Sequence, residues 1–360
     1  MNLYYKHLDI TLDWIEKTFN KEGASSASFS PIVGWSKPYP ETTGYIITTL
    51  LNAYSFTKND KYLHLALRAG RWLLSIQNTN GSFPAGLYNA NKINSPSVFN
   101  TAQIIDGLVE LSIFDKNEIW IKSASKSAIW LADGIDDYGT WSTGHYQANY
   151  NPSYYSQVVW PMLRVWKLTN QKNIKDKSEK VLTRICNKTS QSGEIKDWGF
   201  KPNSHSFTHT IAYTIRGIIE SAIILKEWDK YGTVVEKSID KFYRLSELNN
   251  GKLPGAFNYG WKADRSYTCL TGNVQIAICL MRYEKLFPDL RLVNASAKLV
   301  DYVCLKQKND GYIAGAVGGS FPLWGKYMFM RYPNWAAKYH ADALMMIIKR
   351  LQSEQKKINE

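Results

Sequence analysis

Apolar residues recur along the chain in six long segments that share one pattern. Each segment opens with Pro, Ser, Asn or Thr near an aromatic residue and then carries apolar side chains on most faces. Openings of this kind are typical of helix starts. Apolar side chains all round predict a helix buried on both sides. We expect these six inner helices to be opened by segments that start at Tyr39, Ser95, Asn151, Asn203, Ser266 and Tyr332.

Amphipathic segments lie between the apolar ones. The clearest start at Leu8, Lys61, Glu118 and Arg291, with polar and apolar residues at spacings of three and four. That spacing is typical of an outer helix with one face in water. The alternation repeats roughly every 60 residues, a period found in repeat architectures. It predicts an all-α protein, a single (α/α)6 toroid domain over residues 1–360, with the N-terminal helix beside the last inner helix.

Glycine- and aromatic-rich loops follow the outer helices, at residues 80–89, 138–146, 192–200, 251–261 and 310–325. In a ring of this kind, all connections from outer to inner helices emerge at one end. Loop residues and the first turns of the inner helices are therefore expected to share one cavity mouth.

Two stretches resemble known toroid families. RAGRWLLSIQNTNGSF, with Gln77 and Gly81, is similar to the QW-type repeat of terpenoid cyclases and prenyltransferases, and Gln307 and Gly311 repeat that pattern. The segments starting at Glu41 and Ser95 resemble the C-terminal helical domain of glucuronyl C5-epimerases and, more broadly, polysaccharide lyase toroids. The resemblance implies an α/α-toroid and, from the second group, activity on a glycan.

The terpenoid interpretation fails at its site. The resemblance would imply a DxDD acid motif, and the nearest acidic cluster, Asp133, Asp136 and Asp137, has a different spacing. Protein prenyltransferases would imply an Asp-Cys-His zinc set. The cysteines here lie mostly on apolar helix faces, which suits buried thiols. Fold alone does not carry function, so a glycan-active protein is favoured.

The fourth inner segment carries the richest polar stripe. His205, His209, Tyr213 and Arg216 follow at spacings of four, four and three, so a helix would place them on one face. Removing the C5 proton of a uronic acid needs a base, an acid and a cation for the carboxylate. We assign proton transfer to His209 and Tyr213 and carboxylate binding to Arg216, for an epimerase or a lyase. The alternative is that His and Tyr satisfy buried polar groups between helices.

Glu41 begins the first inner helix, where the helix dipole stabilises a carboxylate. It is expected either to cap the helix or to assist proton transfer. Paired with a second acid, it would make a glycoside hydrolase, because glycosidases place two carboxylates across the bond. The candidates for that second acid are Asp106, Asp137, Asp197, Asp264 and Asp342. The HxxxH pair of His205 and His209 has no third ligand nearby in sequence, so no metal or other cofactor is expected.

Aromatic residues, 14% of the chain, recur near the inner-helix starts. Aromatic faces stack on sugars, and amide or cationic side chains bind hydroxyls and carboxylates. The alternative for each Trp is that it fills a gap between helix ends. The expected sugar-binding residues are Trp35, Tyr39, Asn100, Tyr155, His205, Asn258, Trp261, Arg265, Asn273, Trp324, Trp335, Lys338 and His340.

Composition narrows the partner and the compartment. The net charge of +13 indicates either an acidic partner or simply a composition rich in solvated lysines, and the dispersed Lys and Arg disfavour nucleic acid. No apolar run is long enough for a transmembrane helix, the N-terminus has no secretory pattern, and the four cysteines lack CxxC spacing. We expect a cytoplasmic enzyme of bacterial surface-polysaccharide metabolism, reaching a membrane surface only through a lipid-linked substrate. The remaining alternative is a non-catalytic toroid that binds glycan or docks a glycosyltransferase.

Overall fold

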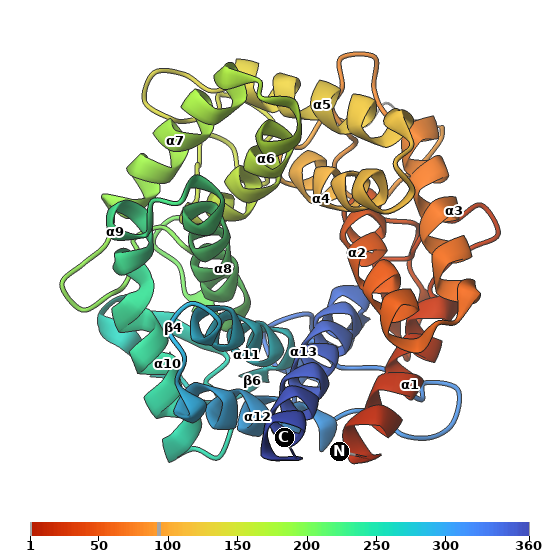
Figure 1. The fold of residues 1–360 in the computed structure, drawn as a ribbon, viewed down its shortest axis with the longest axis vertical. Helices are drawn as coiled ribbons and strands as arrows, with labels where there is room; N and C mark the ends of the chain where they lie inside the picture. The colour runs from red at the N-terminus through yellow and green to blue at the C-terminus, as the bar shows by residue number, and fades with distance from the viewer. Residues whose placement is uncertain (1, 92–94, 360) are drawn as a thin grey trace.

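The computed structural model describes residues 2–91 and 95–359, which form two concentric rings of helices (Figure 1). The inner ring is α2 (Pro40–Thr57), α4 (Val98–Asp115), α6 (Ser156–Thr169), α8 (Thr208–Leu225), α11 (Leu270–Glu284) and α13 (Asn334–Asn359). The outer ring is α1 (Asn2–Lys17), α3 (Asp60–Ile76), α5 (Glu118–Asp133), α7 (Lys172–Cys186), α10 (Glu236–Leu248) and α12 (Leu290–Cys304). Across these described residues the predicted six inner and six outer helices are confirmed.

Short turns lead from inner helices to the outer helices that follow them. Several inner helices end at a residue in the left-handed conformation, such as Lys58 or Lys116. A capping Asn then starts the next outer helix, as Asn59 does by accepting from the Lys61 amide. Because inner and outer helices alternate in direction, all inner helices run the same way. Their N-terminal ends and the long loops share one end of the ring, the loop face; the short turns occupy the turn face.

Small β-pairs tie neighbouring loops together on the loop face. One sheet has the order β2 (Gly34–Trp35), β1 (Ser28–Ser30), β8 (Tyr332–Pro333), and a second has the order β3 (Ser206–Phe207), β4 (Ala256–Asn258), β5 (Lys262–Asp264). A third pairs β6 (Thr268–Cys269) with β7 (Ser320–Phe321). All are antiparallel. The β1–β8 pair joins the first loop to the last and so helps to close the ring.

The two ends of the chain meet without a covalent link. Helix α1 packs beside α13, as predicted, and Figure 1 shows the termini close together. Polar contacts add to the apolar packing here: Gln307 Oε1 accepts a hydrogen bond from His7 Nδ1 at 2.6 Å, and Gln307 Nε2 donates one to Thr11 Oγ1 at 2.6 Å. The buried Gln307 amide thereby connects the end of α12 to α1.

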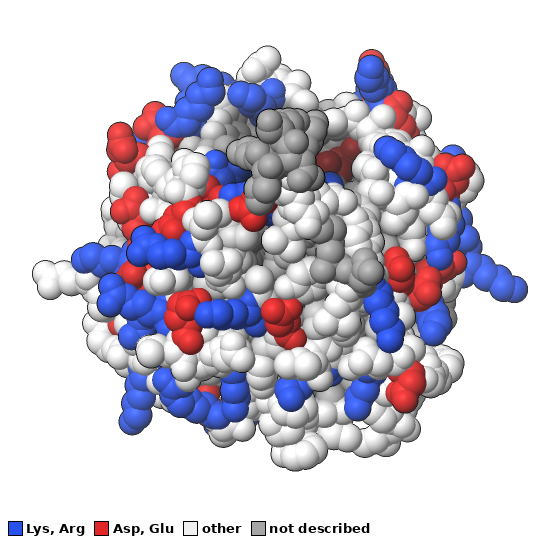
Figure 2. Space-filling model, turned by 60° about the horizontal axis from the view of Figure 1, so that its bottom comes forward, with Lys and Arg blue, Asp and Glu red and all other residues white. Residues whose placement is uncertain are grey.

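Three further facts concern the length of the helices, the thiols and the surface charge. No helix of the described chain is long and apolar enough to cross a membrane. The four cysteines are free and buried. On the face drawn in Figure 2, Lys and Arg side chains are spread between Asp and Glu side chains rather than gathered in one patch.

Candidate functional site

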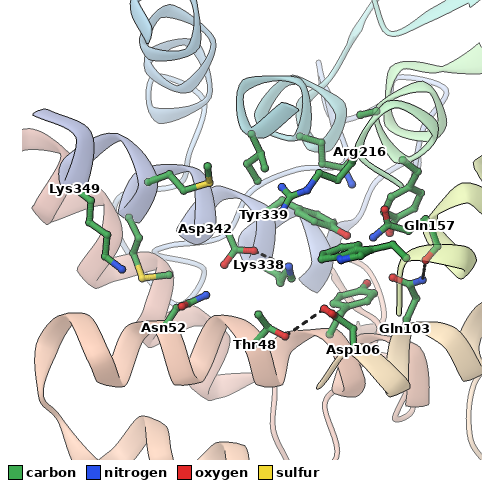
Figure 3. A pocket seen from close by; sticks show the side chains of 18 residues that line it. Thr48, Asn52, Gln103, Asp106, Gln157, Arg216, Lys338, Tyr339, Asp342 and Lys349 are labelled. Atoms are coloured by element: carbon green, nitrogen blue, oxygen red, sulfur yellow. Dashed lines mark hydrogen bonds and ion pairs between the residues drawn. The ribbon is translucent and has the colours of Figure 1, made fainter. Parts of the chain in front are cut away.

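The inner helices present side chains to the ring axis in layers. The sixth residue of five inner helices forms one layer: Tyr45, Gln103, Tyr213, Gln275 and Tyr339. Three residues later, on the same face of each helix, comes a second layer: Thr48, Asp106, Arg216, Ile278 and Asp342. These two layers line a central cavity of about 160 Å³, which Figure 3 shows from close by.

The central cavity extends toward the turn face. Asn52 and Lys349 line it near the C-terminal ends of α2 and α13, where Lys349 is exposed. The buried Tyr45, Tyr213 and Tyr339 form its floor. The prediction that loop residues and first turns would line the mouth is therefore wrong for this cavity, whose lining lies deeper in the helices.

Packed aromatic rings explain why loop and first-turn residues do not line the central cavity. In the first-turn layer, His209 lies 5.1 Å from Tyr327, and Phe200 lies 5.6 Å from Tyr154 between ring centres. The Trp335 indole donates to the Tyr327 hydroxyl at 2.8 Å. This aromatic layer comprises Tyr39, Phe99, Tyr154, Phe200, His209, Tyr327 and Trp335, linked ring to ring. It occupies the space beneath the tyrosine floor.

Lys338 supplies one positive charge inside the cavity. Its Nζ lies 2.6 Å from Asp342 Oδ2 and 4.3 Å from the centre of the Tyr339 ring. The Thr49 hydroxyl donates to the other Asp342 oxygen at 2.9 Å. Burial lowers the pKa of Lys338, but the attraction of Asp342 outweighs it, and the net pKa is raised. Lys338 therefore stays protonated at neutral pH.

Arg216 supplies a second positive charge. Its Nε lies 2.6 Å from Glu220 Oε1, and its guanidinium lies 5.2 Å from the Trp160 ring. Glu220, however, already accepts two hydrogen bonds from Arg282, at 2.6 and 2.7 Å. One carboxylate shared by two guanidinium groups leaves positive charge on the Arg216 side, which lines the cavity.

Two carboxylates share the cavity with these cations. Asp106 lines it from α4, pairs with Arg164 and accepts from Thr48 at 3.3 Å. Arg164 also pairs with Glu110. Asp342 lines the cavity from α13. Both had been second-acid candidates in the sequence, and the structure brings them together in one cavity (Figure 3).

The polar stripe of the fourth inner helix is only partly on the cavity. Tyr213 and Arg216 line it, whereas His209 lies one turn below, with its ring centre 4.3 Å from that of Tyr213. His209 Nδ1 lies 2.7 Å from Gln275 Oε1. Burial lowers the pKa of His209 to about 4, so it is neutral at pH 7. Burial also raises the pKa of Tyr213 well above its ordinary value.

His205 is not part of that stripe, and the prediction that it continues the helix is wrong. Helix α8 begins at Thr208, and Ser206 and Phe207 form β3, which pairs with β4 fifty residues later in the chain. The His205 side chain is exposed on the loop face. A one-helix HxxxH pair therefore does not form.

Glu41 lies outside the lining of the cavity. It is the second residue of α2, as His209 is of α8, so both belong to the aromatic layer. Its Oε2 accepts a hydrogen bond from the Tyr39 hydroxyl at 2.5 Å. Burial raises the pKa of Glu41 to about 7, and the Tyr39 bond opposes that shift.

Four predicted sugar-binding residues are engaged in packing between elements. Asn273 is fully buried, and its amide donates to Gly251 and Leu299 carbonyls. His340 Nε2 lies 3.4 Å from Cys304 Sγ, between α13 and α12. The other two are Asn100, which donates to the Pro84 carbonyl, and Tyr155, packed against Trp141 and His145.

The remaining predicted sugar-binding residues lie on the loop face, apart from Lys338. Trp35 packs against Trp14 and donates to the Tyr312 hydroxyl, and Trp261 packs against Trp198. Arg265 and Trp324 are exposed. Tyr39 and Trp335 belong to the aromatic layer, and His205 and Asn258 line a groove.

Sequence reasoning missed most of the lining. The polar and aromatic lining residues that were not singled out are Tyr45, Thr48, Asn52, Gln103, Gln157, Trp160, Gln275, Tyr339 and Lys349. One signal could have found several of them: Tyr or Gln recurs as the sixth residue of five of the six inner helices. Among the described residues, no group of three His, Cys, Asp or Glu side chains is placed to hold a metal ion.

Comparisons with known proteins identify the fold. No family model and no curated protein sequence matches the chain. Among solved structures, it is similar to an unsaturated glucuronyl hydrolase specific for heparin, with TM-score 0.76, 14% identity, and coverage of 98% of this chain and 97% of the other. It is also similar to the cellobiose 2-epimerase of Bacillus thermoamylovorans, with TM-score 0.73, 16% identity, and coverage of 97% and 100%. A D-mannose isomerase gives TM-score 0.77, 12% identity, and coverage of 97% and 98%. These similarities confirm the α/α-toroid fold.

Proposed function

We propose that this protein is a carbohydrate-active enzyme that binds one acidic sugar residue in the central cavity and moves a proton within it. The observation that carries the proposal is the pair of cations, Arg216 and Lys338, lining a cavity with a tyrosine floor. Toroids of the same fold that are described as a glucuronyl hydrolase, a cellobiose 2-epimerase and a mannose isomerase support a saccharide substrate.

The size of the cavity favours a single sugar ring over a polymer segment. A volume of about 160 Å³ is roughly ten times what one ordered water needs. The mouth near Asn52 and Lys349 leaves room for the rest of an oligosaccharide to extend into solvent. The substrate is therefore the terminal residue of an acidic glycan or a free uronic acid.

The charged side chains of the cavity suggest how the C5 proton of the sugar is removed. A substrate carboxylate on Arg216 would have its charge neutralised, which acidifies the adjacent C5 proton. In this proposal the Asp342 carboxylate, which lines the same cavity, accepts that proton, while Tyr213, a neutral phenol, donates one. His209 and Glu41 take supporting roles beneath the floor. Return of the proton on the other face gives epimerisation, and loss of a leaving group gives β-elimination.

A second candidate function is glycoside hydrolysis. It is favoured by one observation: Asp106 and Asp342 line the same cavity from different helices. The two acids of this alternative are Asp106 and Asp342. They take the place of the pair considered from the sequence, Glu41 with one Asp, because Glu41 lies outside the cavity lining. In this alternative one aspartate protonates the leaving oxygen and the other acts as base or nucleophile.

One incubation separates these functions. Uronate-containing oligosaccharides are mixed with the protein in deuterated water and followed by NMR, ultraviolet absorbance and a reducing-end assay. Deuterium at C5 without cleavage means an epimerase, and an absorbing unsaturated product means a lyase. New reducing ends with neither signal mean hydrolysis. Binding without any reaction would contradict an enzymatic function and would favour a toroid that binds glycan or docks a glycosyltransferase.

We also propose a cytoplasmic setting in surface-polysaccharide metabolism. The four buried free thiols support a reducing compartment. A lipid-linked acidic oligosaccharide would present its terminal sugar to the turn face, where the cavity opens. Localisation of a tagged protein by cell fractionation tests this setting, and a periplasmic or secreted protein would contradict it.

A further inference from the structure

A second hollow lies on the loop face, at the opposite end of the ring from the mouth of the central cavity. Its volume is about 590 Å³, and its walls are the loop before α8 and the β4–β5 hairpin. We call it the lateral groove. The lining residues that matter here are Lys188, Lys196, Lys201, His205, Asn258 and Tyr259. A neighbouring hollow of about 340 Å³ shares the lining residues Lys201, Ser204 and His205 with it.

The walls of the lateral groove are held in place before any ligand binds. The Ser153 hydroxyl donates to the Lys196 carbonyl at 2.5 Å, and the Ser153 amide donates to the Asp197 carbonyl at 2.8 Å. On the opposite wall, the buried Glu194 accepts from the Trp261 amide at 2.9 Å, which fixes the hairpin against the loop. A preformed groove loses less conformational entropy on binding.

The charges in the lateral groove favour an anionic ligand. Lys188 pairs with Asp197 at 2.8 Å, which uses the negative charge of that carboxylate. Lys196 and Lys201 are exposed, and the described residues give neither of them an ion-pair partner. The buried Glu194 is the other carboxylate of the lining, and it is occupied by hydrogen bonds from Trp261 and Ser192.

Tyr259 gives the groove a stacking surface. Its side chain is 83% exposed between β4 and β5, and Asn258 is the preceding residue. An exposed tyrosine beside amide and ammonium groups is the combination that binds sugar faces, hydroxyls and carboxylates.

We propose that the lateral groove binds an acidic oligosaccharide, as a site separate from the central cavity. Because the two sites open at opposite ends of the ring, one sugar residue cannot reach both. The groove instead holds a second glycan chain, or a remote part of a polymer whose end is processed elsewhere. This inference uses none of the residues in the proposed reaction, so it stands or fails independently of it.

The test is a calorimetric titration with a hyaluronate octasaccharide, with a neutral maltooctaose titrated in parallel. The variants are Tyr259→Ala and Lys201→Gln in the groove, and Arg216→Gln in the cavity. The matched control is Tyr138→Ala, since Tyr138 is 84% exposed on another loop. We expect each groove variant to weaken binding about fivefold or more, as the loss of one stacking or ionic contact implies. Arg216→Gln should weaken only the binding in the central cavity and leave the binding in the lateral groove, and Tyr138→Ala should change neither.

Three results would overturn the inference. Loss of all binding in Arg216→Gln, with Tyr259→Ala unaffected, would place the only glycan site in the cavity. Equal affinity for the neutral and acidic octasaccharides would remove the role of Lys201. If neither sugar binds saturably, the lateral groove is not a glycan site, and a protein partner becomes the alternative. A failed titration together with normal turnover would leave the proposed enzyme intact.

Discussion

Arg216 is the side chain on which the proposed substrate specificity depends. It lines the cavity while its partner Glu220 is already held by Arg282, so the fold does not need Arg216 to neutralise Glu220. A charge-assisted hydrogen bond is worth about 1.5–3 kcal/mol, and each 1.4 kcal/mol is about tenfold. We expect Arg216→Gln to lower kcat/KM on a uronate substrate by about ten- to a hundredfold, measured by initial rates.

The control for that variant is Arg244→Gln. Arg244 forms an exposed ion pair with Asp240 on α10, far from the cavity lining. Its substitution removes the same charge and should change neither kcat/KM nor the unfolding transition. If Arg216→Gln retains full kcat/KM, the cavity does not hold the substrate carboxylate there, and the proposed function loses its main support.

Glu41 gives a prediction about stability against pH. Its pKa is about 7 in the folded protein and near 4.5 when unfolded, so the folded state holds the proton more tightly. Stability contributed by the protonated form is present below pH 4.5 and is lost as the pH rises to 7. The difference corresponds to about 3 kcal/mol. We expect Glu41→Gln, which keeps an acceptor for Tyr39, to be more stable than the native protein at pH 8 and similar to it at pH 4.5.

Urea unfolding of both proteins between pH 4.5 and 8 measures this effect. Other titrating groups are common to the two proteins and cancel in the difference between them. Parallel stability curves would mean that Glu41 ionises in a solvated setting. It would then be a carboxylate that could accept a proton, as the assisting role considered from the sequence allows, and the aromatic layer would be open to water.

At the scale of elements, close backbone packing between inner helices sets the width of the ring. A Cβ added to Gly107 of α4 would lie 2.1 Å from the Gly44 carbonyl oxygen of α2, and backbone cannot move aside as a side chain does. Overpacking costs about 1–3 kcal/mol, although Ala favours a helix over Gly by about 1 kcal/mol. We expect Gly107→Ala to destabilise the protein in urea unfolding.

Gly70→Ala is the comparison for this effect. Gly70 also lies within a helix, α3, but its added methyl group would meet the Leu111 and Trp120 side chains, at 2.5 and 2.9 Å. The Leu111 end can rotate away, so the cost should be small or offset by helix propensity. Equal destabilisation by the two substitutions would show that the α2–α4 contact is no tighter than an ordinary core contact.

Which elements form could be predicted because the signals are local. The Ser97 cap and the apolar faces that follow are readable within one segment, and each inner helix forms in its expected segment, starting about one to five residues after the segment begins. The end of the ring at which the cavity opens could not be predicted, since it depends on Tyr154, Phe200 and Tyr327 meeting from distant loops. His205 was misplaced for the same reason: β3 forms only by pairing with β4.

At the scale of the whole molecule, the ring is closed by a contact that repeats one found elsewhere in it. Gln77, after α3, donates to Ser127 of α5 and accepts from Ser123. Gln307, after α12, makes the equivalent contacts with α1. The glutamine of the repeat thus joins successive outer helices. Its last copy, Gln307, joins the end of α12 to α1, where the ring closes.

The two glutamines make equivalent contacts but hold helices that are connected differently along the chain. Two matched variants, Gln307→Ala and Gln77→Ala, are therefore expected to differ in how much they speed hydrogen exchange. Helices α3 and α5 each have ring helices before and after them, whereas α1 is joined to the described ring only through the loop that follows it and can open locally. The loss of two or three buried hydrogen bonds at about 1 kcal/mol each should make α1 amides exchange about thirty- to a hundredfold faster in Gln307→Ala. Native-state hydrogen exchange should show little change in α6 and α8 on the far side. In Gln77→Ala the faster exchange should be smaller and shared by α3 and α5. Uniform acceleration across all helices in Gln307→Ala would mean that the toroid opens only as a whole, and that its closure is as cooperative as a covalent ring.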